Sequence, residues 1–185
     1  MKKFKVYFNA PITIGFASIC IIAYVLDILT NSTSTSVLFS TYGSSLLDPL
    51  TYIRLICHVF GHASLSHLIS NLMYILLLGP MLEEKYHDKL ITVILVTAIV
   101  TGIIHNILDP YTALLGASGI VFAFILLASI TGKNNGIPIT LILVAVLWIG
   151  NEIITGINSL DNVSQFTHII GGFSGCLLGL FYKDN

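Results

Sequence analysis

Four polar residues stand in otherwise apolar stretches of this sequence and together suggest acyl-transfer chemistry. They are Ser118, His168, His67 and Asn71. A serine hydroxyl is a weak nucleophile until a base takes its proton, and histidine suits that role near neutral pH. We therefore expect Ser118 to act as a nucleophile and His168 as its general base. No carboxylate is obviously placed to orient His168, which favours a Ser–His dyad over a triad.

Acyl transfer also needs hydrogen-bond donors for the oxyanion that develops on the substrate. The amide of Ser118, at the start of a predicted helix, can supply one donor. The side-chain amide of Asn71 and the ring of His67 can supply two more. Gly116 and Gly119 flank the serine in Gly116-Ala117-Ser118-Gly119, and Gly119 leaves room for a substrate backbone.

The elements that must position these residues are membrane helices. The chain is 55% hydrophobic and only 9% charged, with a mean hydropathy of +0.92, whereas a soluble domain carries about 25% charged residues. A membrane helix needs roughly 20 mostly apolar residues. Six segments approach this length, so we predict an all-α, polytopic membrane protein built as a six-transmembrane-helix bundle. They are 11–30, 65–83, 90–108, 115–132, 137–156 and 165–182.

Positive charges orient the predicted bundle. If the six spans alternate in direction, all seven lysines fall on one side and only Arg54 on the other. Positive residues mark the cytoplasmic face. We therefore expect residues 1–10 to be a short cytoplasmic N-terminus, 11–183 a single six-helix domain with both termini cytoplasmic, and 31–64 an external loop at the membrane interface. This pattern is typical of a bacterial plasma membrane, and the net charge of −1 gives no indication of nucleic-acid binding.

The same topology places the candidate residues at one depth. Spans two, four and six run from the outside inward, and each carries its polar residues near the outer end, on the order of 5–10 Å below the surface. Three glycines follow His168 at the small-xxx-small spacing that lets membrane helices pack closely. Packing this face against span four would bring His168 toward Ser118. The glycines are Gly171, Gly175 and Gly179.

As a set, these motifs resemble the rhomboid family of intramembrane serine proteases. One motif is an R-x-x-x-x-x-F-x-H-x-x-x-x-H-x-x-x-N pattern that runs from Arg54 to Asn71. The second is the G-x-S-G around Ser118, and the third is His-x-x-Gly from His168 to Gly171, all in family order over about residues 50–183. Glu83 also matches a glutamate that the family often carries.

The resemblance implies an endopeptidase that cuts other membrane proteins, usually single-span helices, near the outer face of the bilayer. Ser118 and His168 would be the dyad, and His67 and Asn71 would help to form the oxyanion hole. No metal or cofactor is implied. The chain departs from the family pattern at four positions. Ile53 replaces an aromatic residue, Phe122 a tyrosine and Thr167 an alanine, and Glu152 is an unexpected charge.

Two other classes of function fit parts of the pattern. His58, His62 and His67 cluster in the sequence, and the first two have the i, i+4 spacing of zinc ligands, but there is no HExxH motif. A transporter or a non-enzymatic scaffold would also carry polar residues in its spans. No inverted repeat is evident, and an inactive relative would be expected to lack Ser118 or His168.

Overall fold

The computed structural model describes residues 7–130 and 162–182, together with a few helical residues between 139 and 150. In the last helix, side chains are described from His168 onward, apart from that of Leu180. The regular elements of this described part are helices. They are α1 (Pro11–Leu29), α2 (Thr33–Val37), α3 (Pro49–Cys57), the short 3-10 helix η1 (His58–Phe60), α4 (Leu65–Tyr86), α5 (Lys89–Leu108), α6 (Ser118–Ile130) and α8 (Asn162–Phe181).

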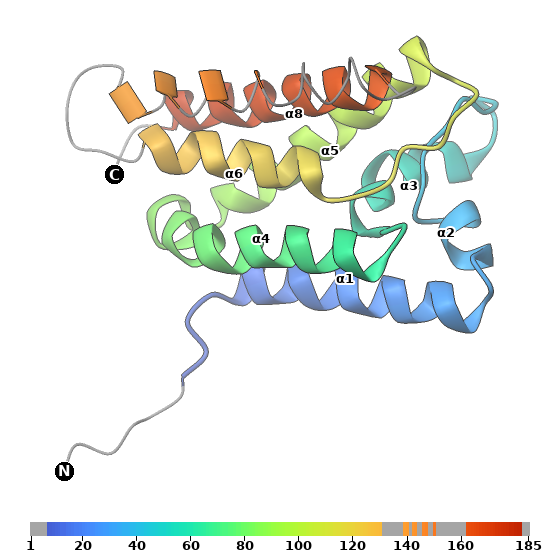
Figure 1. Cartoon of the computed structure of the whole chain (residues 1–185), viewed down its shortest axis with the longest axis horizontal. Helices are drawn as coiled ribbons and strands as arrows, with labels where there is room; N and C mark the ends of the chain where they lie inside the picture. The colour runs from blue at the N-terminus through green and yellow to red at the C-terminus, as the bar shows by residue number, and fades with distance from the viewer. Residues whose placement is uncertain are drawn as a thin grey trace.

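The long helices pack side by side as a bundle, and the short ones gather at one end (Figure 1). α1 lies against α4, α4 also contacts α6, and α8 packs on both α6 and α5. α3 rests on α5, while η1 touches α1, α5 and α6. The segment between α1 and α4 therefore folds back over the end of the bundle where α4, α6 and α8 begin.

Within the described residues, three helices are long and apolar enough to cross a membrane, namely α1, α4 and α5. Shorter apolar stretches cover Ser118–Ile130 and His168–Gly179. The described part is helical, as predicted, and it contains apolar helices of membrane-spanning length, whereas the count of six spans stays a prediction. The fifth predicted span, 137–156, lies for the most part outside the described residues. Lys133, Glu152 and the lysines of both termini lie outside them too.

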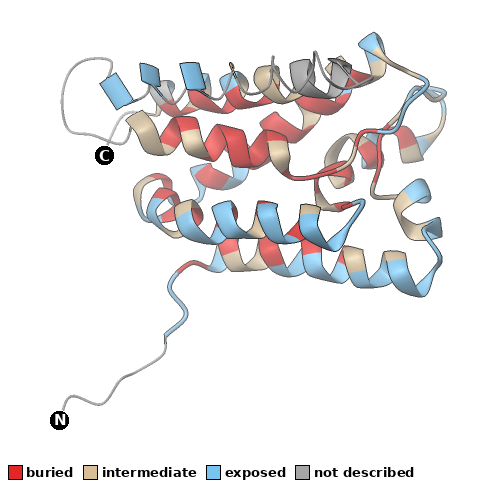
Figure 2. Cartoon of the chain, in the orientation of Figure 1, coloured by how far each residue is buried: buried red, intermediate tan, exposed pale blue. Residues whose placement is uncertain are grey.

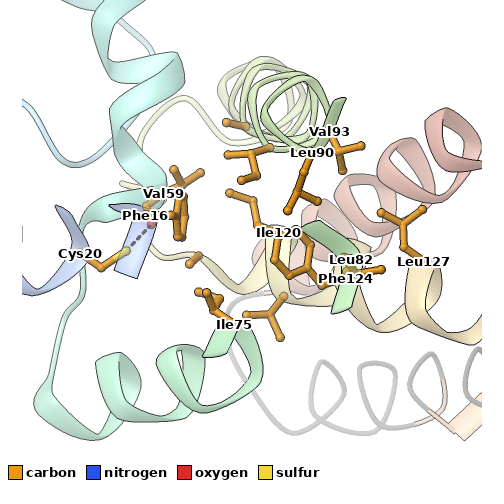
Figure 3. Packing of buried hydrophobic residues seen from close by; sticks show 14 of the residues in the cluster. Phe16, Cys20, Val59, Ile75, Leu82, Leu90, Val93, Ile120, Phe124 and Leu127 are labelled. Carbon is orange, nitrogen blue, oxygen red and sulfur yellow. Dashed lines mark hydrogen bonds between the residues drawn. The ribbon is translucent and has the colours of Figure 1, made fainter. Parts of the chain in front are cut away.

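The helices bury one face and leave the other apolar and exposed. Phe16, Ile75, Leu90 and Phe124 come from four different helices and meet in one packed cluster (Figure 3). The outward faces of α1 and α4 are largely exposed (Figure 2), and the exposed side chains there include Leu77, which is 72% accessible. Lipid is the solvent that accepts such a surface, because hydrocarbon tails are as apolar as leucine.

The C-terminal part of α4 holds the start of α1 through Glu83. One carboxylate oxygen accepts the amide of Ile12 at 2.9 Å, and the other accepts the amide and the hydroxyl of Thr13 at 2.9 and 2.8 Å. The first amides of a helix have no partner within it, and a negative charge is favourable at this positive end of the helix dipole. Pro11 at the first helical position has no N–H group and so needs no acceptor. Glu83 therefore acts as the N-cap that the local sequence of α1 lacks.

The segment between α1 and α4 is held together around Arg54. Its Nε donates to the carbonyl of Val37 at 2.9 Å, its Nη1 lies 3.7 Å from Asp48 Oδ2, and its guanidinium sits 4.7 Å from the centre of the Tyr42 ring. Asp48 also caps α3 by accepting the amide of Leu50. The buried cation is thus paired and hydrogen-bonded, as a charge removed from water must be.

Two buried histidines connect this segment to the bundle. His58 Nε2–H donates to the carbonyl of Ala98 on α5 at 3.1 Å, and His62 Nδ1–H donates to the carbonyl of Phe60 at 3.1 Å. Both side chains are 1% exposed. Burial disfavours the charged imidazolium and lowers the pKa of each histidine from 6.5 to about 4, with neighbouring histidines adding to the effect and the carbonyl contacts opposing it. Both rings are therefore neutral at physiological pH.

We expect Glu83→Gln to lower the free energy of unfolding by about 1–3 kcal/mol, because it removes charge-assisted hydrogen bonds and turns one acceptor into a donor that faces other donors. Equilibrium unfolding in mixed micelles measures this change. Glu84→Gln, at the exposed neighbouring position, is the matched control and should leave the unfolding curve in place. Equal curves for both variants would contradict the capping role.

Acid should destabilise the fold through His58 and His62. Their pKa values are lower in the folded chain than in the unfolded one, so the unfolded state takes up protons first as the pH falls. Stability is complete above about pH 6.5 and decreases toward pH 4, by at most about 1.4 kcal/mol per pH unit for each histidine. Unfolding at pH 7, 5.5 and 4.5 tests this, and a His58→Gln/His62→Gln double variant should show a weaker dependence. A parent stability that does not change with pH would refute it.

Candidate active site

The structure brings Ser118 and His168 into hydrogen-bond contact, although they are 50 residues apart in the sequence. Ser118 Oγ lies 2.7 Å from His168 Nε2. Ser118 is the first residue of α6, and His168 lies in the first third of α8. Both side chains are partly exposed, so a reacting group could reach them. This is the geometry that a nucleophile and its base require.

A tight turn presents Ser118 at the start of α6. Gly116 has a φ of +124°, which is outside the right-handed helical region and accessible mainly to glycine. Its amide donates to the carbonyl of His58 at 3.0 Å, and just upstream Leu114 pairs with Thr41 through two backbone hydrogen bonds of 2.9 Å. The predicted span began at residue 115, and the helix begins three residues later because Gly116 cannot continue it.

The same glycine makes room for His67. A Cβ atom on Gly116 would lie 2.7 Å from His67 Cε1, 2.9 Å from His67 Nε2 and 3.7 Å from Ser118 Oγ. The imidazole of His67 therefore occupies the space beside the serine that any larger residue at position 116 would fill. His67 is held from behind by the ring of His62, whose centre is 5.0 Å away in an edge-on arrangement. The amide of His67 donates to Ser64, the N-cap of α4.

Asn71 lies one turn further along α4 than His67. It is only 5% exposed, and its Nδ2 finds no hydrogen-bond partner among the described residues. Leaving a buried amide group unpaired costs roughly 1–3 kcal/mol. A cost of this size calls for an explanation. One explanation is that the Asn71 amide forms its hydrogen bond only when a substrate is present.

The first turn of α6 offers a second kind of donor. The earliest helical hydrogen bond here runs from the amide of Val121 to the carbonyl of Ala117, so the amides of Ser118, Gly119 and Ile120 precede the intrahelical ladder. Such amides, at the positive end of a helix dipole, form a ready site for a negatively charged oxygen. The serine amide is thus one of the donors that could serve an anionic oxygen beside the Ser118 side chain.

Glycines allow α8 to approach α6 closely. A Cβ on Gly171 would lie 3.5 Å from the Cα of Gly119, and one on Gly175 only 2.4 Å from the Cβ of Ala123. A Cβ on Gly179 would overlap the side chain of Leu127. The three glycines predicted from their spacing therefore all lie in the contact between the two helices. Gly172 lies beside them against the fully buried ring of Phe122.

The three-histidine zinc site does not appear in the structure. Nε2 of His58 and Nδ1 of His62 are hydrogen-bonded to backbone carbonyls. Within the described residues, no group of three or more histidine, cysteine or acidic side chains could hold a metal ion. The predicted departures at Thr167 and Glu152 fall outside the described side chains.

Two structural roles escaped the sequence analysis. Glu83 was noted only as a family match, and the donors that it serves lie 70 residues earlier in the chain. Thr101, on α5, lies between α6 and α8 next to Gly171 and Gly119. The available signal was the i, i+4 pair of Thr97 and Thr101 in the middle of a mostly apolar helix, because polar residues inside spans usually have a partner or a role.

Comparison with known proteins identifies the family. The Rhomboid domain family model matches residues 49–185. The chain is 28% identical over 184 residues to Rhomboid protease GlpG of Yersinia pestis (strain Pestoides F), which covers 95% of this chain and 64% of that protein. It is 29% identical to Rhomboid protease GlpG of Yersinia pseudotuberculosis serotype I (strain IP32953) over the same length.

A relative from an animal is similar over a shorter stretch. Rhomboid-related protein 1 of Caenorhabditis elegans is 31% identical over 137 residues, covering 68% of this chain and 38% of that protein. The chain thus spans less than two thirds of the length of the Yersinia relatives and less still of the animal one. The match to the family model, over residues 49–185, includes His67, Asn71, Ser118 and His168. On this evidence the chain belongs to the rhomboid family, whose members are polytopic membrane proteins.

Proposed function

We propose that this protein is an intramembrane serine endopeptidase that cleaves transmembrane segments of other membrane proteins near the outer face of the bilayer. The observation that carries the proposal is the 2.7 Å contact between Ser118 Oγ and His168 Nε2. A serine and a histidine 50 residues apart meet at the start of a helix, beside further polar groups, inside a bundle with a lipid-facing surface. Membership of the rhomboid family supports the same function.

The first half of the reaction forms an acyl-enzyme. Ser118 Oγ attacks the carbonyl carbon of the scissile peptide while its proton passes to His168 Nε2. For this step Nε2 must be the unprotonated nitrogen, which puts the ring proton on Nδ1. The tetrahedral intermediate collapses when the imidazolium returns the proton to the leaving amine. The C–N bond breaks, and the acyl group stays on Ser118 as an ester.

The second half releases the acyl group. His168 takes a proton from water, and the resulting hydroxide attacks the ester carbonyl. The second tetrahedral intermediate collapses to a carboxylic acid, and the proton returns from His168 to Ser118 Oγ. Two residues suffice for both steps, because the base of one step is the acid of the next.

The oxyanion of both intermediates would be stabilised by donors already in place. These are the amide of Ser118, the Nδ2 group of Asn71 and the ring of His67. Asn71 would gain in the intermediate the hydrogen bond that it lacks among the described residues. Donors that need no reorganisation during the reaction account for much of the rate enhancement in acyl transfer.

The location of the reaction follows from the proposed topology. Ser118 is the first residue of α6, and α6 begins at the end of the bundle where α2 and α3 lie (Figure 1). With Arg54 outside and the lysines inside, this end faces the exterior of a bacterial plasma membrane. The substrate would be a single-span protein whose helix unwinds locally, since a regular helix hides its carbonyl carbons from a nucleophile. The six-helix domain over 11–183 would enclose the site.

A fluorophosphonate probe tests the dyad without knowledge of the substrate. We expect the purified protein to be labelled, and labelling to disappear in Ser118→Ala and in His168→Ala. Ser129→Ala, which changes a serine on the same helix whose hydroxyl donates to the carbonyl of Ile125, is the matched control and should label like the parent. Labelling that survives Ser118→Ala would place the nucleophile elsewhere. No labelling of the parent, in detergent and in liposomes, would favour a non-enzymatic relative.

Asn71→Ala should slow labelling by on the order of 10²-fold, the usual cost of losing one oxyanion donor. Because Nδ2 of Asn71 has no partner among the described residues, its removal strands no acceptor there, and we expect the unfolding curve to change little. The measurement is the second-order rate constant of labelling, together with thermal unfolding. A variant that is labelled as fast as the parent would exclude Asn71 from the oxyanion hole.

A further inference from the structure

Thr101 occupies the point where α5, α6 and α8 meet beneath the Ser118–His168 contact. The side chain is 3% exposed. A Cβ on Gly171 of α8 would lie 2.7 Å from Thr101 Oγ1, and a Cβ on Gly119 of α6 would lie 3.4 Å from the same oxygen. The methyl group of Thr101 would lie 3.6 Å from the Cβ on Gly171 and 3.5 Å from the Cβ on Gly119. One side chain therefore touches both helices of the dyad.

These contacts fall next to the reacting residues. Gly119 directly follows Ser118, and Gly171 comes three residues, or about one turn, after His168. A change in the bulk of Thr101 would therefore shift the spacing between α6 and α8 at the depth of the dyad. Close-packed interiors transmit such changes, because they contain few voids that could absorb them.

The side chain of Thr101 is also fixed in orientation. Its hydroxyl donates to the carbonyl of Thr97, one turn earlier on α5. This back-bond restricts a threonine in a helix to one of its two common rotamers. Thr101 is thus a spacer with a defined shape, anchored on a third helix.

We propose that Thr101 is a positioning residue, whose anchored side chain sets the spacing of α6 and α8 and thereby holds Ser118 and His168 in contact. The proposal rests on the function proposed above, and it concerns geometry only, since Thr101 takes no part in proton transfer. Reaction rates respond steeply to such geometry: a displacement of about 1 Å can cost on the order of 100-fold.

A compensating pair of substitutions tests the spacer. Gly171→Ala should force the helices apart, because its methyl would meet Thr101 Oγ1, and should slow fluorophosphonate labelling of Ser118 by roughly 10- to 100-fold. Thr101→Ala should also slow labelling, by about tenfold, because it removes the spacer. In the double variant the new methyl at position 171 enters the space left by Thr101. We expect its labelling rate to return to within about threefold of the parent.

Two further variants separate positioning from general destabilisation. Thr101→Ser keeps Oγ1, the atom nearest Gly171, and should retain most of the labelling rate. Thr97 and Gly175 form the matched control one turn deeper. A Cβ on Gly175 would lie 2.4 Å from the Cβ of Ala123 and 3.1 Å from Thr97 Oγ1, so Thr97→Ala cannot rescue Gly175→Ala. Losses that simply add in Thr101→Ala/Gly171→Ala, while the parent is labelled, would overturn the proposal.

A second readout keeps this test apart from that of the proposed function. In protein labelled with 15N-histidine, the Nε2 chemical shift of His168 reports its hydrogen bond to Ser118 whether or not the protein is active. Thr101→Ala should move this resonance, and the double variant should return it toward the parent position. If the parent does not react with the fluorophosphonate probe but its His168 resonance behaves in this way, the protease function is refuted and the spacer role of Thr101 is supported. An unmoved resonance would refute the spacer.

Discussion

The close approach of α6 and α8 is the constraint on which the rest of the site depends. A helix in hydrocarbon must satisfy its own backbone hydrogen bonds, so reactive groups have to be supplied by side chains on neighbouring helices. A serine and a histidine have short side chains, and their contact at 2.7 Å needs backbones nearer than leucines would permit. Gly171 and Gly175 allow the two backbones to approach this closely. No polar attraction between the helices is needed, because close packing itself stabilises the association of membrane helices.

The two ends of the bundle are held in different ways. At the end where α1 begins, a single carboxylate, that of Glu83, satisfies the first amides of α1. At the opposite end, backbone hydrogen bonds join separate segments: His58 with Gly116, and Thr41 with Leu114. The irregular backbone before Ser118 is covered by protein, with Leu114, Gly116 and Ala117 all buried. The turn that carries the serine is thus packed into this end of the bundle.

The sequence was sufficient to predict the long helices and several of the residues that meet. Apolar length predicted α1, α4 and α5, and the shared depth of His67, Ser118 and His168 anticipated their grouping. Spacing alone also predicted that Gly171 faces span four. Each of these inferences depends on a periodicity or a length, which are local properties of the chain.

What escaped prediction depends on contacts between distant segments. The start of α6 at Ser118 follows from the positive φ of Gly116, a backbone angle that a glycine permits but does not require. The cap by Glu83 pairs residues 70 positions apart, and a glutamate near a helix end has many other possible roles. The histidine cluster was open to a zinc interpretation because i, i+4 spacing does not reveal whether ring nitrogens converge or bind carbonyls. Backbone angles and side-chain directions, and not residue type, decided these cases.

The separation of Ser118 and His168 along the chain bears on the order of events during synthesis. The ribosome makes His168 50 residues after Ser118, and the glycine contacts with α6 form only once α8 packs against that helix. A chain halted before that point would carry the serine, the oxyanion donors and most of the bundle, yet no base. Under the proposed mechanism, the nascent protein therefore stays inert toward neighbouring membrane proteins until α8 docks, and the assembly of the bundle itself times the onset of activity.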